Sequence, residues 1–368
     1  MTTTAPASAN PPAHRFEVID LYRGFGAICI VIAHAPELLG GQFLPQAYLA
    51  LDVFFVMSGF VIANGFDQAI TRGMSFQRFF LLRLIRFYPA YLFALLVTTP
   101  LLVVWWQVSQ KAYSGGNLLG SFAASLFMLP SPLDPDGKGR LYALNGVCWS
   151  LFFEVVVNVF YFLLFPWLRR NVLLLILASS ALLSIVVRLY SGTLDMGFYV
   201  DNAILVLPKL TFAFFAGVFL RRHAFGLIRH SPGPGTAAIS LLAMIILFQH
   251  SRFTQGVATA AVDFIAVFLV FPAIVLFSSG ISSKPWLAAC GQWSGRFSYP
   301  MYVLQDAGFF VVAAAFKLLL GLRVASIAPW GLAPLLVLLL IVSLATDKWL
   351  EPWGAKRMRS YLLPAKNK

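Results

Sequence analysis

Charged residues are scarce in this sequence. Of its 368 residues only 11% are charged, whereas 60% are hydrophobic. A soluble globular protein has about 25% charged and about 45–50% apolar residues. The composition therefore excludes an ordinary soluble protein, and it leaves no polar stretch long enough for a sizeable soluble domain. It predicts one polytopic membrane domain.

Cysteine is nearly absent as well. Cys29, Cys148 and Cys290 lie far apart, in or beside apolar segments, and no CxxC pair is present. The sequence therefore predicts neither a disulfide framework nor a metal site, and no permanently bound cofactor is expected. The first eighteen residues lack the apolar core of a cleavable signal peptide, so we expect the first spanning helix to target the protein.

Acidic residues are outnumbered by basic ones, 14 against 27, which gives a formal net charge of +13. A basic balance is common in nucleic-acid-binding proteins, where the cations form a stripe with interleaved aromatic residues. Here they stand in short breaks between apolar runs, so we expect no nucleic-acid partner. Internal repeats are also missing, and an inverted-repeat transporter has no support from the sequence.

Long apolar runs make up most of the chain. A transmembrane helix needs about 20 residues, and the runs approach or exceed that length. The expected fold class is all-α, a polytopic transmembrane helical bundle of about ten spans. The expected divisions are a polar N-terminal tail at 1–18, a transmembrane domain at 19–350 and a basic C-terminal tail at 351–368. The predicted spans are 19–37, 46–66, 88–108, 143–165, 171–188, 200–220, 235–250, 257–278, 297–319 and 329–347.

Basic residues divide unequally between the two sides of this layout. Eighteen fall on the side that holds both termini and seven on the other, with Arg23 and Lys209 inside helices. Cytoplasmic loops carry the excess of Lys and Arg. We therefore predict a multi-pass protein of the cell membrane with both termini in the cytoplasm. The longest loop, 109–142, is then external, and its apolar stretch Leu118–Met128 is expected to lie in the interface or to re-enter the membrane.

The predicted helix 19–37 places three ionisable side chains on one face. At about 100° per residue, Asp20, Arg23 and His34 fall within an arc of about 60°, beside the small residues Gly24 and Ala27. Ionisable groups at membrane depth usually face a partner or a water-filled cavity. Arg23 and His34 are about 16 Å apart along the axis, a span that suits a long, thin ligand. A buried histidine that joins helices and an arginine that reaches back to the interface are the structural alternatives.

A carboxylate stands near the start of the next span. The short link from Pro36 to Pro45 makes 19–37 and 46–66 an antiparallel hairpin, which brings His34 and Asp52 within about two turns in depth. A carboxylate beside an imidazole raises its basicity and fixes its tautomer. His34 is therefore the candidate catalytic base and Asp52 its candidate orienting partner. An aspartate that only caps the helix is the alternative.

The span 143–165 carries a polar stripe. Ser150, Glu154, Asn158 and Tyr161 cover an arc of about 80° on an otherwise apolar helix. Glu154 is deep enough that an unpaired carboxylate is unfavourable. It is therefore protonated, paired with an arginine, or part of a site. Ser150, Asn158 and Tyr161 are candidate substrate or supporting residues.

Two arginines precede the span 88–108. Arg83 and Arg86 lie one turn apart on one face of a basic and aromatic segment. The planar guanidinium group suits phosphate oxygens, so this pair is a candidate site for a phosphorylated ligand. Ordinary positive-inside anchoring is the alternative.

These features together resemble the membrane-bound acyltransferase 3 family, which includes O-antigen and exopolysaccharide O-acetylases, nodulation-factor acylases and macrolide acyltransferases. Six segments carry the resemblance in order over almost the whole chain. Two departures are visible, because Tyr22 stands where the family commonly has leucine, and Gln305 where a motif usually ends in histidine. The segments are IDLYRGFGAICIVIAH, LALDVFFVMSGFVI, RLIRFYPAY, CWSLFFEVVVNVFYFLLFP, CGQWSGRFSYPMYVLQ and WLEPW.

The resemblance implies an O-acyltransferase. It makes His34 the catalytic histidine, and it makes Arg23, Arg83 and Arg86 essential basic residues on the donor side. It also implies acyl-CoA, acetyl-CoA in particular, as the donor and a glycan or similar hydroxyl compound as the acceptor. A transporter or lipid-linked-glycan carrier that uses Asp20, Arg23 and His34 as a substrate or proton pathway is the alternative, followed by a noncatalytic membrane scaffold.

Overall fold

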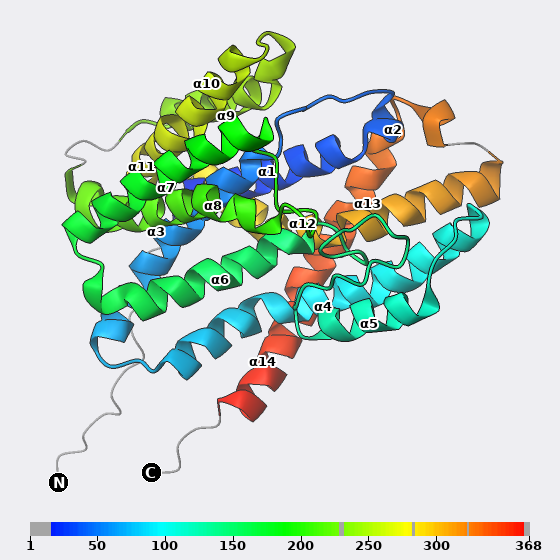
Figure 1. The fold of residues 1–368 in the computed structure, drawn as a ribbon, viewed down its shortest axis with the longest axis horizontal. Coiled ribbons are helices and arrows are strands. Elements are labelled where there is room, and N and C mark those ends of the chain that lie inside the picture. Colours follow the sequence, from blue (N-terminus) through cyan, green and yellow to red (C-terminus); the bar gives the residue numbers. More distant parts are fainter. Residues whose placement is uncertain (1–15, 228–231, 282–283, 322–323, 364–368) are drawn as a thin grey trace.

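The computed structural model describes residues 16–227, 232–281, 284–321 and 324–363. Within these ranges the chain is helical and has no β-strand beyond one isolated bridge between Arg140 and Tyr199. Figure 1 shows the helices gathered in a single bundle, which the helix formed by α13 and α14 crosses steeply. The predicted all-α class is confirmed.

The first half of the described chain follows the predicted spans closely. α4 is the exception, because it takes in the basic segment with Arg83 and Arg86 as its first turns. The elements are α1 (Glu17–His34), α2 (Pro36–Leu39), α3 (Leu49–Thr71), α4 (Phe76–Val108), α5 (Gly115–Leu126), α6 (Cys148–Leu164) and η1 (Phe165–Trp167).

In the second half, π-helical turns join shorter helices into long ones. Three such joined helices cover Ala203–Ala224, Val257–Ser279 and Leu332–Leu362. The elements are α7 (Arg170–Ser191), η2 (Ala203–Val206), α8 (Leu207–Phe219), η3 (Leu220–Ala224), η4 (Phe225–Leu227), α9 (Gly235–Gln249), η5 (His250–Arg252), α10 (Val257–Ile265), η6 (Ala266–Val270), α11 (Phe271–Ser279), α12 (Pro285–Leu320), η7 (Val324–Ile327), α13 (Leu332–Ala345), η8 (Thr346–Leu350) and α14 (Glu351–Leu362).

Eight of the described helices are long and apolar enough to cross a membrane, which makes the chain a multi-pass membrane protein. Two of the ten expected spans are not among them. α1 carries Glu17, Asp20 and Arg23 in its first two turns, and α9 has only 15 residues. The number of ten spans and the cytoplasmic position of the termini therefore remain predictions.

α1 defines the two ends of the bundle. Arg23 lies in its second turn and His34 is its last residue. We call one end of the bundle the Arg23 end, and it also contains Arg86 of α4 and Glu351 of α14. We call the other the His34 end, and it also contains Gln305 of α12. Eleven residues separate Arg23 from His34, or about 16 Å along the helix.

Glycines let pairs of helices cross at backbone contact. A Cβ atom on Gly59 of α3 would lie 1.9 Å from the carbonyl oxygen of Phe214 in α8, and one on Gly291 of α12 would lie 2.0 Å from that of Glu17 in α1. Small residues at such crossings allow the close packing that joins membrane helices. The contact of α1 with α12 is what brings His34 beside Gln305.

The predicted C-terminal tail begins with a helix. Glu351–Leu362 form α14, which continues α13 through the π-helical turn at Thr346–Leu350. A Cβ on Gly354 would lie 2.8 Å from Cβ of Pro89, so α14 packs directly on α4. The boundary drawn at residue 350 thus falls inside one continuous helix.

The apolar stretch Leu118–Met128 lies largely in α5. The C-terminal end of α5 is held against α4, because the hydroxyl groups of Tyr88 and Tyr91 donate to the carbonyl oxygens of Leu126 and Ser125 at 2.8 and 2.6 Å. The segment therefore packs along the bundle as a helix of its own (Figure 1).

Candidate active site

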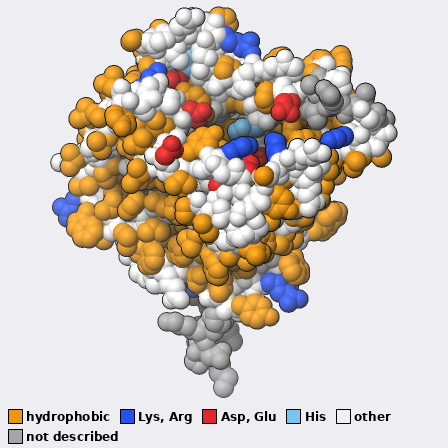
Figure 2. Space-filling view, turned by 45° about the vertical axis from the view of Figure 1, so that its right-hand side comes forward, with side chains coloured by type: hydrophobic (Ala, Val, Ile, Leu, Met, Phe, Trp, Pro, Cys, Tyr) orange, Lys and Arg blue, Asp and Glu red, His pale blue; other side chains and the backbone are white. Residues whose placement is uncertain are grey.

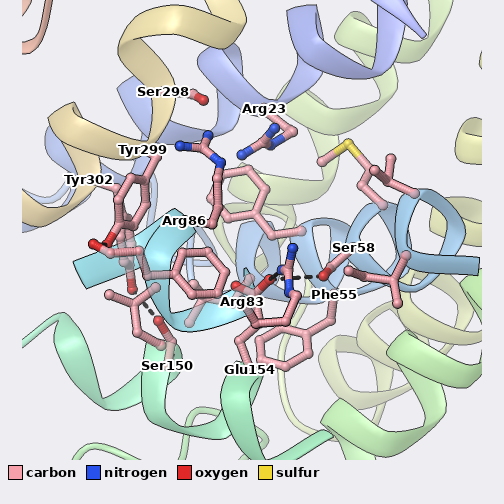
Figure 3. Close-up of a pocket in the computed structure, with 17 residues that line it drawn as sticks. Arg23, Phe55, Ser58, Arg83, Arg86, Ser150, Glu154, Ser298, Tyr299 and Tyr302 are labelled. Carbon is pink, nitrogen blue, oxygen red and sulfur yellow. Dashed lines mark hydrogen bonds and ion pairs between the residues drawn. The ribbon is translucent and has the colours of Figure 1, made fainter. Parts of the chain in front are cut away.

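A cavity with an empty volume of about 880 Å³ lies among α1, α3, α4, α6 and α12 (Figure 3). We call it the arginine cavity. Five of the residues predicted from the sequence line it together, although they come from three helices that are distant in the chain. These residues are Arg23, Arg83, Arg86, Ser150 and Glu154.

Each arginine of this group has one carboxylate partner. Because the three guanidinium groups also repel one another, the carboxylates are needed to hold them in one place. Glu154 additionally accepts a hydrogen bond from Oγ of Ser58 at 2.9 Å. The pairs are Arg23 with Asp20 at 3.4 Å, Arg83 with Glu154 at 3.3 Å, and Arg86 with Glu351 at 2.8 Å.

Arg83 and Arg86 differ in depth. The side chain of Arg83 is 14% exposed and lies over the ring of Phe87, whereas that of Arg86 is 40% exposed and lies over the ring of Tyr299. Cation–π contacts of this kind fix the orientation of a guanidinium group. Arg83 therefore belongs to the inner part of the cavity and Arg86 to its entrance.

At the opposite end of α1, His34 is exposed and lines several adjoining cavities. The largest, which we call the histidine cavity, has an empty volume of about 1110 Å³. Figure 2 is turned toward this end and shows a hollow in which a histidine and charged side chains of both signs gather. Aromatic and polar side chains that line the cavity include Gln42, Tyr48, Trp149, Asp195, Phe198, Tyr199 and Asn202.

The imidazole of His34 is oriented by Gln305. Nδ1 of His34 lies 3.1 Å from Oε1 of Gln305, and Nε2 of Gln305 donates to the carbonyl oxygen of Tyr302 at 2.9 Å. That second bond turns the amide oxygen toward His34, so Nδ1 of His34 is the donor. Nε2 of His34 then carries a lone pair, and none of the described residues binds it.

Asp52 does not contact His34. Its Oδ2 atom accepts from Nζ of Lys209 in α8 at 3.1 Å, and both side chains are buried. A lysine inside an apolar helix requires a counter-ion, and Asp52 is the carboxylate within its reach. The position that the sequence analysis gave to Asp52 beside His34 is therefore occupied by Gln305 instead.

The predicted polar stripe of α6 divides between two surroundings. Ser150 lies 2.7 Å from the hydroxyl of Tyr302 and, with Glu154, faces the arginine cavity. Asn158 donates to the carbonyl oxygen of Glu154 in its own helix at 2.6 Å. Tyr161 hydrogen-bonds to Asp67, farther toward the Arg23 end. Neither Asn158 nor Tyr161 lines either cavity.

The two cavities meet at a thin wall. Leu51 of α3 and Tyr302 of α12 line both of them. The hydroxyl of Tyr302 is held by Ser150 and by the carbonyl oxygen of Val147, at 2.7 and 2.9 Å. These two side chains therefore form the boundary that the two cavities share.

Asp195 is an acidic residue near His34, and its surroundings change its pKa. Asp195 lies in the loop after α7 and lines the histidine cavity with His34. Burial raises the pKa of Asp195, and the nearby Lys209 and His34 oppose that rise. Asp306 of α12, the residue after Gln305, lines two further cavities with His34, so two carboxylates lie near the imidazole.

Sequence reasoning missed the roles of Gln305, Tyr302 and Lys209. Gln305 stood out only as a departure from a motif, although a glutamine in an apolar helix needs hydrogen-bond partners. Lys209 gave a clear signal, because a charged residue inside a span requires a carboxylate on another helix. Tyr302 gave none, since its position depends on how α12 meets α6.

Comparison with known proteins identifies relatives of this chain. A family model described as an acyltransferase domain, that of the acyltransferase 3 family, matches residues 16–347. The chain is similar to a protein described as "Protein 2 in picA locus" of Rhizobium radiobacter, with 32% identity over 163 residues. That match covers 42% of this chain and 84% of the relative. No solved structure matches the chain significantly.

Proposed function

The chain belongs to the acyltransferase 3 family and is a membrane acyltransferase; on that premise we propose that it transfers an acetyl group from acetyl-CoA to a hydroxyl group of a glycan. One observation carries the proposal. His34, whose side chain is exposed and whose Nδ1 is bonded by Gln305, stands at the far end of a helix whose other end carries the arginine cavity.

The donor enters at the Arg23 end, and the excess of Lys and Arg on this side supports a cytoplasmic position for it. Acyl-CoA is made there, and its phosphates require cations. Arg86 at the entrance suits these phosphates, and the inner cavity takes the arm that ends in the thioester. The Arg23–His34 distance of about 16 Å along α1 matches an extended pantetheine arm.

The acceptor binds at the His34 end. Aromatic side chains of the histidine cavity offer flat apolar surfaces, and the few polar groups between them can bind hydroxyls. A sugar has an apolar ring face and a rim of hydroxyl groups, so it fits both kinds of lining. Asp195 and Asn202 are candidate hydrogen-bonding partners for that rim.

His34 acts as a general base in this scheme. Its Nε2 atom removes the proton of the acceptor hydroxyl while that oxygen attacks the thioester carbonyl carbon. The C–S bond then breaks, the acyl group stays on the acceptor oxygen, and the imidazolium returns its proton to the sulfur of CoA. Gln305 keeps Nδ1 protonated throughout, which leaves Nε2 as the atom that reacts.

The Leu51–Tyr302 wall is where donor and acceptor meet. The thioester comes from the arginine cavity and the hydroxyl from the histidine cavity, and only these two side chains line both. The hydrogen bonds of Tyr302 to Ser150 and Val147 fix the wall, so the arm must fit beside it.

Comparison of surface-glycan masses from producing cells with and without this chain tests the proposal. We expect glycans from cells that carry the chain to be heavier by whole acetyl groups, and we expect His34→Ala to remove the difference. Identical masses, together with no consumption of acetyl-CoA by purified protein and the cell's glycan fraction, would overturn it.

A further inference from the structure

A second cavity lies beside the arginine cavity, between α4 and α14. The two share Arg83 and Arg86, and the second has an empty volume of about 1290 Å³. We call it the mouth. Its other lining residues are Phe66, Leu82, Ile85, Asp347, Glu351, Pro352, Ala355, Lys356 and Arg359.

The mouth has more cationic side chains than carboxylates, and the cations that lack an ion pair among the described residues lie on α14. Four cationic side chains and two carboxylates line it. Both carboxylates are already engaged, because Glu351 pairs with Arg86 and Asp347 with Arg296, each at 2.8 Å. Lys356 and Arg359 are exposed, and no carboxylate in the described part of the chain forms an ion pair with either.

The geometry of α14 separates these two cations from their neighbour. Glu351, Ala355 and Arg359 recur every fourth residue and line the mouth, with Lys356 beside them. Arg357 stands between Lys356 and Arg359 in the sequence, yet it does not line the mouth. Its guanidinium group lies instead over the ring of Trp353, at 5.5 Å from the centroid.

From this arrangement we infer that Lys356 and Arg359 of α14 bind the phosphate groups of a nucleotide thioester. The inference rests on the proposed function and specifies where its donor is held. Arg83 lies deep and is neutralised by Glu154, so it offers little net charge to a phosphate. Lys356 and Arg359 are exposed and have no carboxylate partner among the described residues. The phosphates stay in the mouth, while the uncharged pantetheine arm runs past Arg86 into the arginine cavity.

Anionic lipid headgroups present the same phosphate chemistry to a basic helix beside a membrane. The two sources differ in one respect. A nucleotide bound in the mouth competes with the donor substrate, whereas a lipid headgroup depends on the composition of the bilayer. Measurements in a neutral bilayer therefore separate them.

The test compares Lys356→Ala, Arg359→Ala and the double variant with Arg357→Ala, all in full-length protein in phosphatidylcholine nanodiscs. Arg357→Ala is a matched control, because it removes the same charge from the same helix outside the mouth. KM is measured for acetyl-CoA and for acetyl-pantetheine, which lacks the nucleotide. Binding of radiolabelled CoA is measured in parallel as a readout independent of turnover.

We expect each mouth variant to raise KM for acetyl-CoA and Kd for CoA about 10-fold, and the double variant more. Values for acetyl-pantetheine and for Arg357→Ala should match those of the parent. Equal losses with both donors, or equal losses in Arg357→Ala, would overturn the inference. So would a defect that appears only when phosphatidylglycerol is added, since that result identifies a lipid site. If the parent binds CoA but transfers no acetyl group, the proposed function fails while the mouth assignment stands on the CoA measurements.

Discussion

The arginine cavity and the histidine cavity share a wall but differ in electrostatics. In the first, three arginines are each held by a carboxylate, and the cations are oriented before any ligand arrives. In the second, the imidazole of His34 is held by a neutral amide and its Nε2 atom stays available. In the proposed function, the first cavity holds a charged donor and the second moves a proton.

This difference explains why the polar residues of the bundle do not form one continuous site. At Nδ1 of His34 the amide of Gln305 orients the ring without adding charge, while the carboxylates of Asp195 and Asp306 line cavities beside the imidazole. Carboxylates beside the arginines relieve the repulsion among like charges. The variants described below test whether changes in one cavity affect donor binding and changes in the other affect turnover.

The largest effect is expected from His34→Ala. Loss of a general base lowers turnover by about 10²–10⁴-fold, so kcat should fall in that range while KM for acetyl-CoA stays near the parental value. Kinetics of purified protein measure both constants. Unchanged elution in size-exclusion chromatography shows that the variant is folded, and turnover close to that of the parent would remove His34 from the mechanism.

Arg83→Ala tests the inner part of the arginine cavity. It removes the partner of Glu154 and a cation beside the thioester arm, so KM should rise for acetyl-CoA and for acetyl-pantetheine alike, by roughly 10- to 150-fold. Steady-state kinetics with the two donors give the comparison. The double variant Arg83→Ala with Glu154→Gln is the control, because it removes the unpaired carboxylate as well. A loss confined to acetyl-CoA would move the phosphate site inward from the mouth.

Gln305 offers a test of the tautomer. Gln305→Leu removes the acceptor for Nδ1 of His34, and we expect kcat to fall about 10- to 100-fold, by analogy with the loss of hydrogen-bond partners of metal-ligating histidines. Gln305→Glu restores an acceptor and adds charge that stabilises the imidazolium. The acid limb of its pH–rate profile should therefore move to higher pH. An unshifted profile in Gln305→Glu would show that the two side chains do not interact during turnover.

Asp52 and Lys209 should have the smallest effect on turnover and a large one on stability. Removing one partner of a buried ion pair leaves an uncompensated charge, so Asp52→Asn and Lys209→Met should each destabilise the protein by about 3 kcal/mol. Combining them should recover most of that loss. Thermal unfolding of the three variants in detergent measures this. A folded Asp52→Asn protein with strongly reduced kcat would restore Asp52 to the catalytic group.

The sequence predicted which ionisable residues share a cavity better than it predicted which residues pair with each other. Arg23, Arg83, Arg86 and Glu154 stood out because charged side chains in apolar helices are costly, and they do share a cavity. The pairing of Asp52 failed for a physical reason. The position of two residues along a helical hairpin gives only their depth. Whether they pair also depends on the neighbouring helices, and here Lys209 of α8 forms the ion pair with Asp52.

The C-terminal segment shows the same limit of sequence reasoning. Residues 351–368 read as a basic tail, because their composition is polar and the apolar run before them stops. The packing of Gly354 on Pro89 shows that α14 lies against α4, and Glu351, Lys356 and Arg359 of α14 line the mouth. Contacts between helices that are far apart in the sequence depend on the fold, so a local sequence pattern does not predict them.

The central claim is that donor and acceptor act from opposite ends of the bundle. Right-side-out and inside-out membrane vesicles from producing cells test it directly, with radiolabelled acetyl-CoA added outside and label counted in the glycan fraction. A cysteine in 221–234 or in 109–142, placed in a cysteine-free version and labelled by an impermeant thiol reagent, fixes which end faces the medium. The account predicts that glycans are labelled only in vesicles that turn the Arg23 end outward. Labelling only in vesicles of the opposite orientation would contradict it.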